Sequence, residues 1–274
     1  ILSLLIPIMA GMGLNFGIVL GAMTGQAGLF VITVLDIKGM TGLLVAILVS
    51  VPLSILLGWL TALLLNKTKG QEMIAGMILG FFAMGIYQFI FLFFIGGIMP
   101  PLNAPGIMLS NGIGVRNTID IPGVKYAFDN VYKINIFMFT IICASLWIVY
   151  IVYQGVKNKK FSKKNITQIV IAGLLIAFSI IGQTLPAFAQ YKVLLQIPVF
   201  TFGLIVLLCL FIKFLFKTKL GQDMRAAGHN MEIAEVAGIN VNKVRTIATI
   251  LSMVFAGIGQ IIFLQNLGNI SMYN

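Results

Sequence analysis

Long apolar runs separated by short polar segments form the dominant pattern of this chain. Each run is roughly 20 residues or longer, the length that a helix needs to cross the ~30 Å hydrocarbon core of a bilayer. The core offers backbone groups no hydrogen-bond partner, so runs of this length cross it as helices. The runs lie at residues 40–65, 71–96, 134–156, 165–185, 193–216 and 244–265.

The first 38 residues depart from this simple pattern. A single helix over residues 1–36 would be roughly 50 Å long, which exceeds the thickness of the core. Glycines gather at residues 21–28, and we predict a break there. A broken helix and a helix followed by a re-entrant piece both fit this stretch.

The composition supports a membrane protein. With 59% hydrophobic residues, 9% charged residues and a mean hydropathy of +1.06, the chain has too little polar surface to coat a water-soluble globule. We therefore predict an all-α, polytopic transmembrane fold that forms a single domain over residues 1–274.

The net charge of +11 raises the question of nucleic-acid binding, and the positions of the basic residues answer it. Thirteen of the 18 Lys and Arg residues fall in clusters at residues 67–69, 157–164 and 213–245, whereas five lie in the alternate loops. This segregation follows the positive-inside rule, so the clusters face the cytoplasm. The basic residues adjoin span ends and carry no stacking aromatics, which argues for membrane lipid and against nucleic acid as a partner.

One long polar insert, residues 221–241, interrupts the apolar C-terminal half. Asn230 can cap a short helix by accepting from the backbone amides ahead of it. Glu232 and Glu235 place negative charge in the early turns of that helix, and Gly238 supplies a left-handed stop. We expect a second short helix at residues 223–227 that ends at Gly228, so that two short helices form a rigid knob suited to a cytosolic partner.

This insert and the helix after it resemble those of ABC-importer permeases, in the branch that serves sugars, nucleosides and branched-chain amino acids. Upstream, residues 21–28 and 58–70 carry a weaker resemblance. Many sugar permeases have Gly-Gly-Ile-Asp-Leu-Ser-Val-Gly where residues 21–28 read Gly-Ala-Met-Thr-Gly-Gln-Ala-Gly, which weighs against a sugar substrate. The resemblance rests on Arg225-Ala-Ala-Gly-His-Asn230, Ala234, Ala237-Gly-Ile-Asn-Val241, Ser252 and Ala256-Gly257.

The resemblance implies a transport subunit of a prokaryotic cytoplasmic membrane. Its partners would be cytosolic ATP-binding subunits, a second permease subunit, identical or homologous, and an extracytoplasmic solute-binding protein or lipoprotein. Related permeases continue through further helices, so we expect more chain beyond both ends. Residues 219–243 would form the coupling loop, with contacts to the ATPase expected from Asp223, Arg225, His229, Asn230, Glu232, Glu235 and Gly238.

We do not expect this chain to bind ATP or to catalyse a reaction. The sequence holds no Gly-x-x-x-x-Gly-Lys-Ser/Thr phosphate loop, so ATP and Mg²⁺ would bind to a partner ATPase. The one histidine, His229, lies in the coupling loop, where we expect it to shape the loop or touch the ATPase; Arg225 could form an ion pair there or with the partner. Cys143 and Cys209 lie within predicted spans, so neither a metal site nor a disulfide is implied.

Two other classes of function compete with an importer subunit. A secondary carrier or facilitator commonly places an ionisable group at membrane depth, whereas every Asp and Glu here maps to a loop or a helix end. A scaffold or intramembrane enzyme is disfavoured because catalytic groups are missing. The secondary carrier or facilitator is therefore the leading alternative.

Neutral polar residues within the apolar runs are candidates for the solute pathway. Each must find a partner in another helix or in a water-filled path, because an unpaired polar group is costly in lipid. Thr24 and Gln26 stand out because they lie in the predicted break. The full set is Asn15, Thr24, Gln26, Gln88 and Gln260.

The long outer segment, residues 97–133, is the second candidate surface. It mixes Pro, Gly and Asn with charged residues, and long structured loops are often functional. In an importer it would meet the solute-binding protein through Arg116, Asp120 and Lys125; a lid packed on its own permease is the alternative.

Overall fold

The computed structural model describes residues 2–91, 95, 107, 116–157, 163–185 and 188–271. In this part, five helices are long and apolar enough to cross a membrane, and a sixth span results if the bent pair of α8 and α9 is counted as one. The predicted all-α, polytopic fold is therefore confirmed. The chain divides into two compact units, Ile1–Phe128 with Leu204–Asn274 (unit 1) and Asp129–Gly203 (unit 2), which we describe separately.

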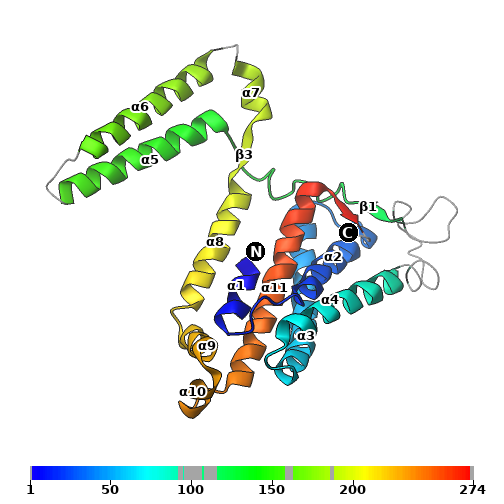
Figure 1. Cartoon of the computed structure of the whole chain (residues 1–274). Coiled ribbons are helices and arrows are strands. Elements are labelled where there is room, and N and C mark those ends of the chain that lie inside the picture. Colours follow the sequence, from blue (N-terminus) through cyan, green and yellow to red (C-terminus); the bar gives the residue numbers. More distant parts are fainter. Residues whose placement is uncertain are drawn as a thin grey trace. The chain divides into compact units, whose positions relative to one another are not determined.

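Unit 1 contains the first four helices and the last three, together with most of α8 (Figure 1). Its elements are α1 (Leu2–Met9), α2 (Ile18–Val34), α3 (Gly39–Lys67), α4 (Glu72–Phe89), β1 (Thr118–Asp120), α8 (Val199–Leu215), α9 (Lys219–His229), α10 (Met231–Val236), α11 (Val241–Leu267) and β4 (Asn269–Ser271).

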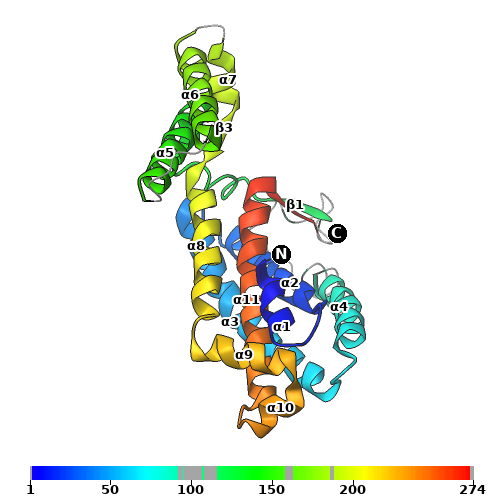
Figure 2. The ribbon, with the colours of Figure 1, turned by 60° about the vertical axis from the view of Figure 1, so that its left-hand side comes forward.

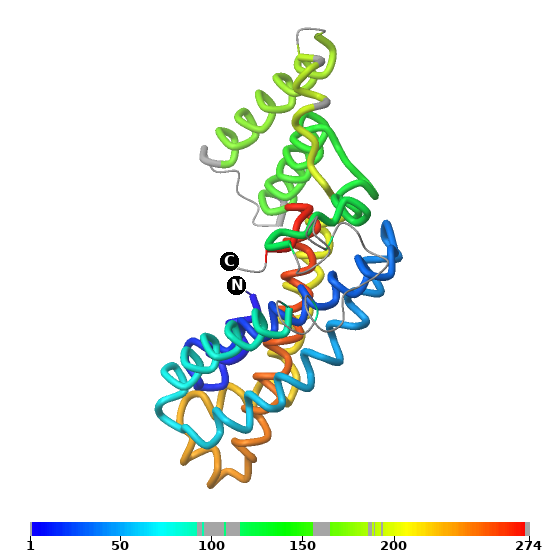
Figure 3. Tube along the Cα trace, turned by 90° about the vertical axis from the view of Figure 1, so that its right-hand side faces the viewer, coloured from blue at the N-terminus to red at the C-terminus, as the bar shows by residue number. Residues whose placement is uncertain are grey.

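Helices α2, α3 and α11 lie side by side and form the packed centre of unit 1 (Figures 1 and 3). Small residues allow this close approach. A Cβ placed on Gly21 of α2 would lie 2.6 Å from the carbonyl oxygen of Met253 in α11, and Gly28 faces the backbone of Ala46 in α3 just as closely. Glycines on facing surfaces let helix backbones approach closely in a membrane, where dispersion contacts drive helix association.

The interruption in the first apolar stretch lies at residues 10–17, and the prediction of a break at residues 21–28 is wrong. Helix α2 is continuous from Ile18 to Val34, and its glycines are packing positions. The chain turns earlier, where Gly11 and Gly13 adopt φ of +74° and +65°. The Asn15 side chain then accepts a hydrogen bond from the Gly17 amide at 3.0 Å, just ahead of α2.

The end of α11 far from the coupling loop is covered by residues 116–128. Strand β1 pairs antiparallel with β4, so that Ile119 lies opposite Ile270. The Ile121 amide donates to the Gly268 carbonyl at 2.9 Å. Sequence patterns gave no sign of these short strands, which fasten residues 116–128 to the end of α11.

Unit 2 is a helical hairpin with a short strand pair at its base (Figure 1). Helices α5 and α6 pack against each other, and Gly182 of α6 receives the ring of Phe137 of α5. Strand β2 pairs antiparallel with β3, and the Thr201 hydroxyl donates to the Asp129 carboxylate. Its elements are β2 (Lys133–Asn135), α5 (Ile136–Lys157), α6 (Lys163–Thr184), α7 (Ala189–Leu194), β3 (Gln196–Pro198) and the start of α8.

Candidate functional site

The coupling loop forms two helices, α9 and α10, at one end of α11 (Figure 2). Helix α9 begins after Thr218, whose hydroxyl oxygen accepts a hydrogen bond from the Gly221 amide at 3.4 Å. It runs from Lys219 to His229, so the predicted limits of residues 223–227 with a stop at Gly228 are wrong. Gly228 lies inside the helix, where its missing side chain lets α9 contact the backbone of α1.

The predicted caps of α10 are confirmed. The Asn230 side chain accepts from the Ile233 amide at 3.1 Å. Gly238 has φ of +83°, and its amide donates to the Glu235 carbonyl at 3.0 Å, while the Ile239 amide donates to the Ala234 carbonyl at 3.0 Å. This pair of bonds is a Schellman motif, which satisfies the last carbonyls of the helix and fixes where the chain turns.

An apolar base holds the coupling loop against α1 and α11. Met224, Ala227 and Ala234 are buried and pack with Ile6 of α1 and Val241 of α11. Helix α10 leaves apolar groups on its outer side, where Ile233 is 67% and Val236 is 91% exposed. The loop is therefore firmly seated on one side and presents an apolar tip on the other.

Two of the predicted coupling residues of α9, Arg225 and His229, line an open hollow. Its volume is about 510 Å³, and its walls include Met9 of α1 together with Arg225 and His229. The Arg225 guanidinium lies over the ring of Phe216 at 5.7 Å from the centroid. This cation–π contact was not predicted from the sequence. His229 is exposed in the last turn of α9, and Asp223 is half-buried.

The acidic residues of α10 face solvent. Glu232 lies in the first turn, where its negative charge is attracted to the positive end of the helix dipole. Glu235 forms an ion pair with Lys69 at 3.4 Å, between side chains that are 55% and 39% exposed respectively. An exposed pair of this kind contributes little stability because water screens it.

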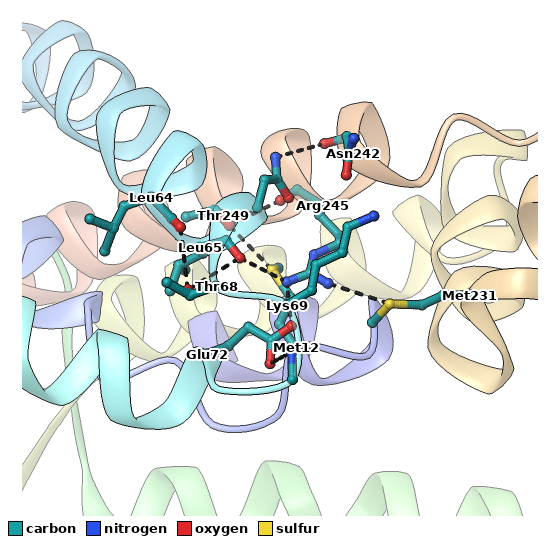
Figure 4. A network of polar contacts seen from close by, with 12 residues as sticks. Met12, Leu64, Leu65, Thr68, Lys69, Glu72, Met231, Asn242, Arg245 and Thr249 are labelled. Carbon is teal, nitrogen blue, oxygen red and sulfur yellow. Dashed lines mark hydrogen bonds and ion pairs between the residues drawn. The ribbon is translucent and has the colours of Figure 1, made fainter.

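A buried ion pair lies beneath the coupling loop (Figure 4). The side chain of Arg245 is 0% exposed, and its Nη2 donates to Oε1 of Glu72 at 2.5 Å. The same nitrogen donates to the Leu65 carbonyl at 3.2 Å, and Nη1 lies 3.4 Å from the sulfur of Met231. One guanidinium, carried by α11, thus contacts α3, α4 and α10.

Sequence reasoning missed this pair. It assigned Arg245 to a cytoplasmic basic cluster and Glu72 to a helix end. A signal was available, because Arg245 shares the buried face of α11 with Val241, Ala248 and Thr249. A charge on the apolar face of a helix requires a buried partner.

Comparison with protein families gives a match over residues 123–274, to the branched-chain amino acid transport system permease component. The match covers more than half of the chain and includes the whole coupling loop. The chain belongs to this family. It is thus a permease component of an ABC transporter and a multi-pass membrane protein, in a class of transport subunits that work with an ATPase and a binding protein. Neither the curated proteins nor the solved structures gave a match.

Two of the permease's pathway candidates, Thr24 and Asn15, are buried. The Thr24 hydroxyl donates to the Gly21 carbonyl at 2.7 Å and lies 3.2 Å from the Ser50 hydroxyl and 2.5 Å from that of Ser54. Asn15 is 2% exposed and caps the turn ahead of α2. These contacts favour packing roles for both residues.

The other pathway candidates, Gln26, Gln88 and Gln260, are half-buried. Gln260 of α11 packs near Gly25 of α2, since a Cβ placed on Gly25 would lie 3.1 Å from the Gln260 Cβ. The structure therefore brings Gln260 next to the helical turn that carries Gln26.

The binding-protein candidates lie in the segment that covers the far end of α11. Asp120 is in β1, and Lys125 packs its aliphatic stem on Gly268 and places its amine 5.2 Å from the ring centroid of Tyr126. Arg116 donates its amide to the Ile107 carbonyl at 2.9 Å. Most of residues 97–115 lies outside the described residues. Within the described ranges, no group of three or more His, Cys, Asp or Glu residues is placed to hold a metal ion.

Proposed function

We propose that this permease is the transmembrane subunit of an ATP-driven importer in a prokaryotic cytoplasmic membrane. It moves a small polar solute, such as a sugar, a nucleoside, an amino acid or a related compound, by alternating access. ATP and Mg²⁺ are bound and used by separate cytosolic subunits. A second permease subunit completes the pathway, and an extracytoplasmic binding protein delivers the solute.

The observation that carries this proposal is the apolar tip of α10. Ile233 and Val236 lie three residues apart on one side of a helix that is capped at both ends. An exposed apolar pair at the end of a polar loop is suited to burial against another protein. Because the other side of the loop is packed against α1 and α11, a push on α10 would reach the spans rather than bend the loop.

The distribution of charge favours an ATP-driven permease over a secondary carrier. In the described part of unit 1, the buried ion pair of Glu72 and Arg245 lies at the first residue of α4 and in the first turns of α11. Both positions are at the coupling-loop end of the spans. A carrier driven by protons or sodium commonly places such a group near the midplane of the membrane.

Neutral polar groups suit the solute pathway. Amide side chains such as those of Gln26 and Gln260 can exchange hydrogen bonds with hydroxyl, amide or amino groups of a solute. Neutral donors and acceptors bind less tightly than charged ones, which favours release on the opposite side.

Purification of the tagged permease from its native membranes tests the proposal. The wild-type protein should retain a subunit that hydrolyses ATP, and the variant Ile233→Asp with Val236→Asp should lose it while inserting normally. Leu35→Asp is the matched control, because Leu35 is 60% exposed at the other end of unit 1. The proposal fails if no ATP-hydrolysing subunit accompanies the wild-type protein, or if the double variant retains it in full.

A further inference from the structure

The buried carboxylate of Glu72 binds two groups: the backbone of the turn between α3 and α4, and the guanidinium of Arg245. Its Oε2 accepts a hydrogen bond from the Gly70 amide at 3.0 Å, at a turn where Gly70 has φ of +88°. Its Oε1 accepts from Arg245, which also donates to the last turn of α3 at Leu65. The ion pair therefore links the α3–α4 turn to the start of α11.

Helix α10 is linked to this turn in two ways, one direct and one through Arg245 of α11. One is the exposed pair of Lys69 and Glu235, which water and salt screen. The other is buried: the sulfur of Met231, the first residue of α10, lies against the guanidinium of Arg245. Displacement of α10 must therefore shift Met231 against a side chain that is already bonded to α3 and α4.

A buried ion pair is a weak source of stability, because desolvation of the two charges offsets most of their attraction. Apolar groups of similar size at both positions are often equally stable, whereas removal of one partner alone leaves a costly buried charge. What such a pair does supply is a single defined arrangement of the elements that carry it. A defined arrangement of this kind, placed between a docking surface and two spans, lets movement of the docking surface reach the spans.

We propose that Arg245 and Glu72 are positioning residues that make α10, the α3–α4 turn and α11 move as one body when an ATPase acts on the coupling loop. Their ion pair thereby sets how much solute is transported for each ATP hydrolysed. This inference rests on the proposed function and adds to it a buried link between the docking surface and two spans.

The double variant Glu72→Gln with Arg245→Met separates this role from a purely structural one. Glu72→Gln keeps an acceptor for the Gly70 amide, and Arg245→Met supplies a side chain that packs on Met231 without a buried charge. We expect normal assembly with the ATPase, an unchanged melting temperature and unchanged basal ATP hydrolysis. Uptake per ATP hydrolysed should fall by roughly tenfold, a typical size for a coupling between sites.

Lys69→Gln is the matched control, because it removes the exposed ion pair between the α3–α4 turn and α10 and leaves the buried pair in place. Uptake per ATP should stay at the wild-type value. Wild-type coupling in the double variant would overturn the inference and leave the proposed function intact. If the wild-type permease binds no ATPase, the proposed function itself fails.

Should the double variant not assemble, Arg245→Lys decides the question. Lysine keeps the charge, but its single ammonium cannot reproduce the planar fork that serves Glu72, Leu65 and Met231 together. Reduced uptake per ATP in this variant supports the positioning role, and an unchanged ratio rejects it.

Discussion

At the residue scale, Gly238 decides where α10 ends. Its φ of +83° lies in the left-handed region, and no atom lies within 4 Å of a Cβ placed there, so the backbone conformation alone restricts substitution. Gly238→Val should cost roughly 1–2 kcal/mol because a β-branched residue is strained in this region. The result should be a misaligned coupling loop, with ATP hydrolysis uncoupled from uptake in an otherwise inserted protein.

The control for this prediction is Gly238→Asn, because asparagine tolerates the left-handed conformation. Uptake and ATP hydrolysis by the reconstituted complex are the measurements. Normal solute-stimulated hydrolysis and normal uptake in Gly238→Val would refute the coupling role of this turn.

Thr24 and Gln26 provide a second prediction at this scale. Thr24→Val removes a hydroxyl that contacts Gly21, Ser50 and Ser54, so it should lower thermal stability and leave uptake per assembled complex unchanged.

Gln26→Ala should change uptake rate or solute preference at nearly unchanged stability. Unchanged uptake and specificity in Gln26→Ala would assign this residue to packing and remove it from the pathway.

At this scale, helix caps could be predicted from the sequence, whereas contacts between residues far apart in the chain could not. The caps at Asn230 and Gly238 could be predicted because each acts within a few residues along the chain. The partner of Arg245 is 173 positions away, at Glu72. No periodicity within one helix could identify it, because the pairing depends on how α3, α4 and α11 pack.

At the scale of elements, the glycines of α2 show why the break was misplaced. A glycine in an apolar run is compatible with an unwound segment or with close helix packing, and local sequence does not separate the two. Packing accounts for Gly21 and Gly28, whereas the break uses Gly11 and Gly13 with positive φ. The long apolar runs themselves became helices, since a membrane leaves such runs no alternative.

Two glycines of α11 test this packing directly. A Cβ on Gly257 would lie 2.8 Å from the Ser50 hydroxyl and 2.9 Å from those of Ser54 and Thr24, whereas a Cβ on Gly259 would have nothing within 4 Å. Gly257→Ala should therefore destabilise the protein by roughly 1–3 kcal/mol. Gly259→Ala should change stability by less than about 0.5 kcal/mol. Thermal unfolding in detergent measures both, and equal melting temperatures for the two variants would contradict the packing described for α2, α3 and α11.

At the scale of the whole molecule, the charge distribution predicts the orientation in the membrane. In unit 1, eight basic residues lie at the coupling-loop end, and three, Lys38, Arg116 and Lys125, lie toward the other end. We expect cysteines at Gln222 and Asn158 to label from the cytoplasm, and one at Asn117 to label from outside. The background should lack Cys143 and Cys209, which are both exposed. Labelling of positions 117 and 158 from the same side would overturn the assignment.

Transport in proteoliposomes tests the central claim most directly. The complex would be reconstituted with its ATPase and ATP enclosed, with the binding protein and candidate solutes outside, and both uptake and ATP hydrolysis would be followed. An importer permease predicts uptake that requires enclosed ATP and is lost with the Ile233→Asp and Val236→Asp variant. Uptake at the same rate without ATP, or uptake driven by a proton or sodium gradient, would contradict it and identify a facilitator or a secondary carrier.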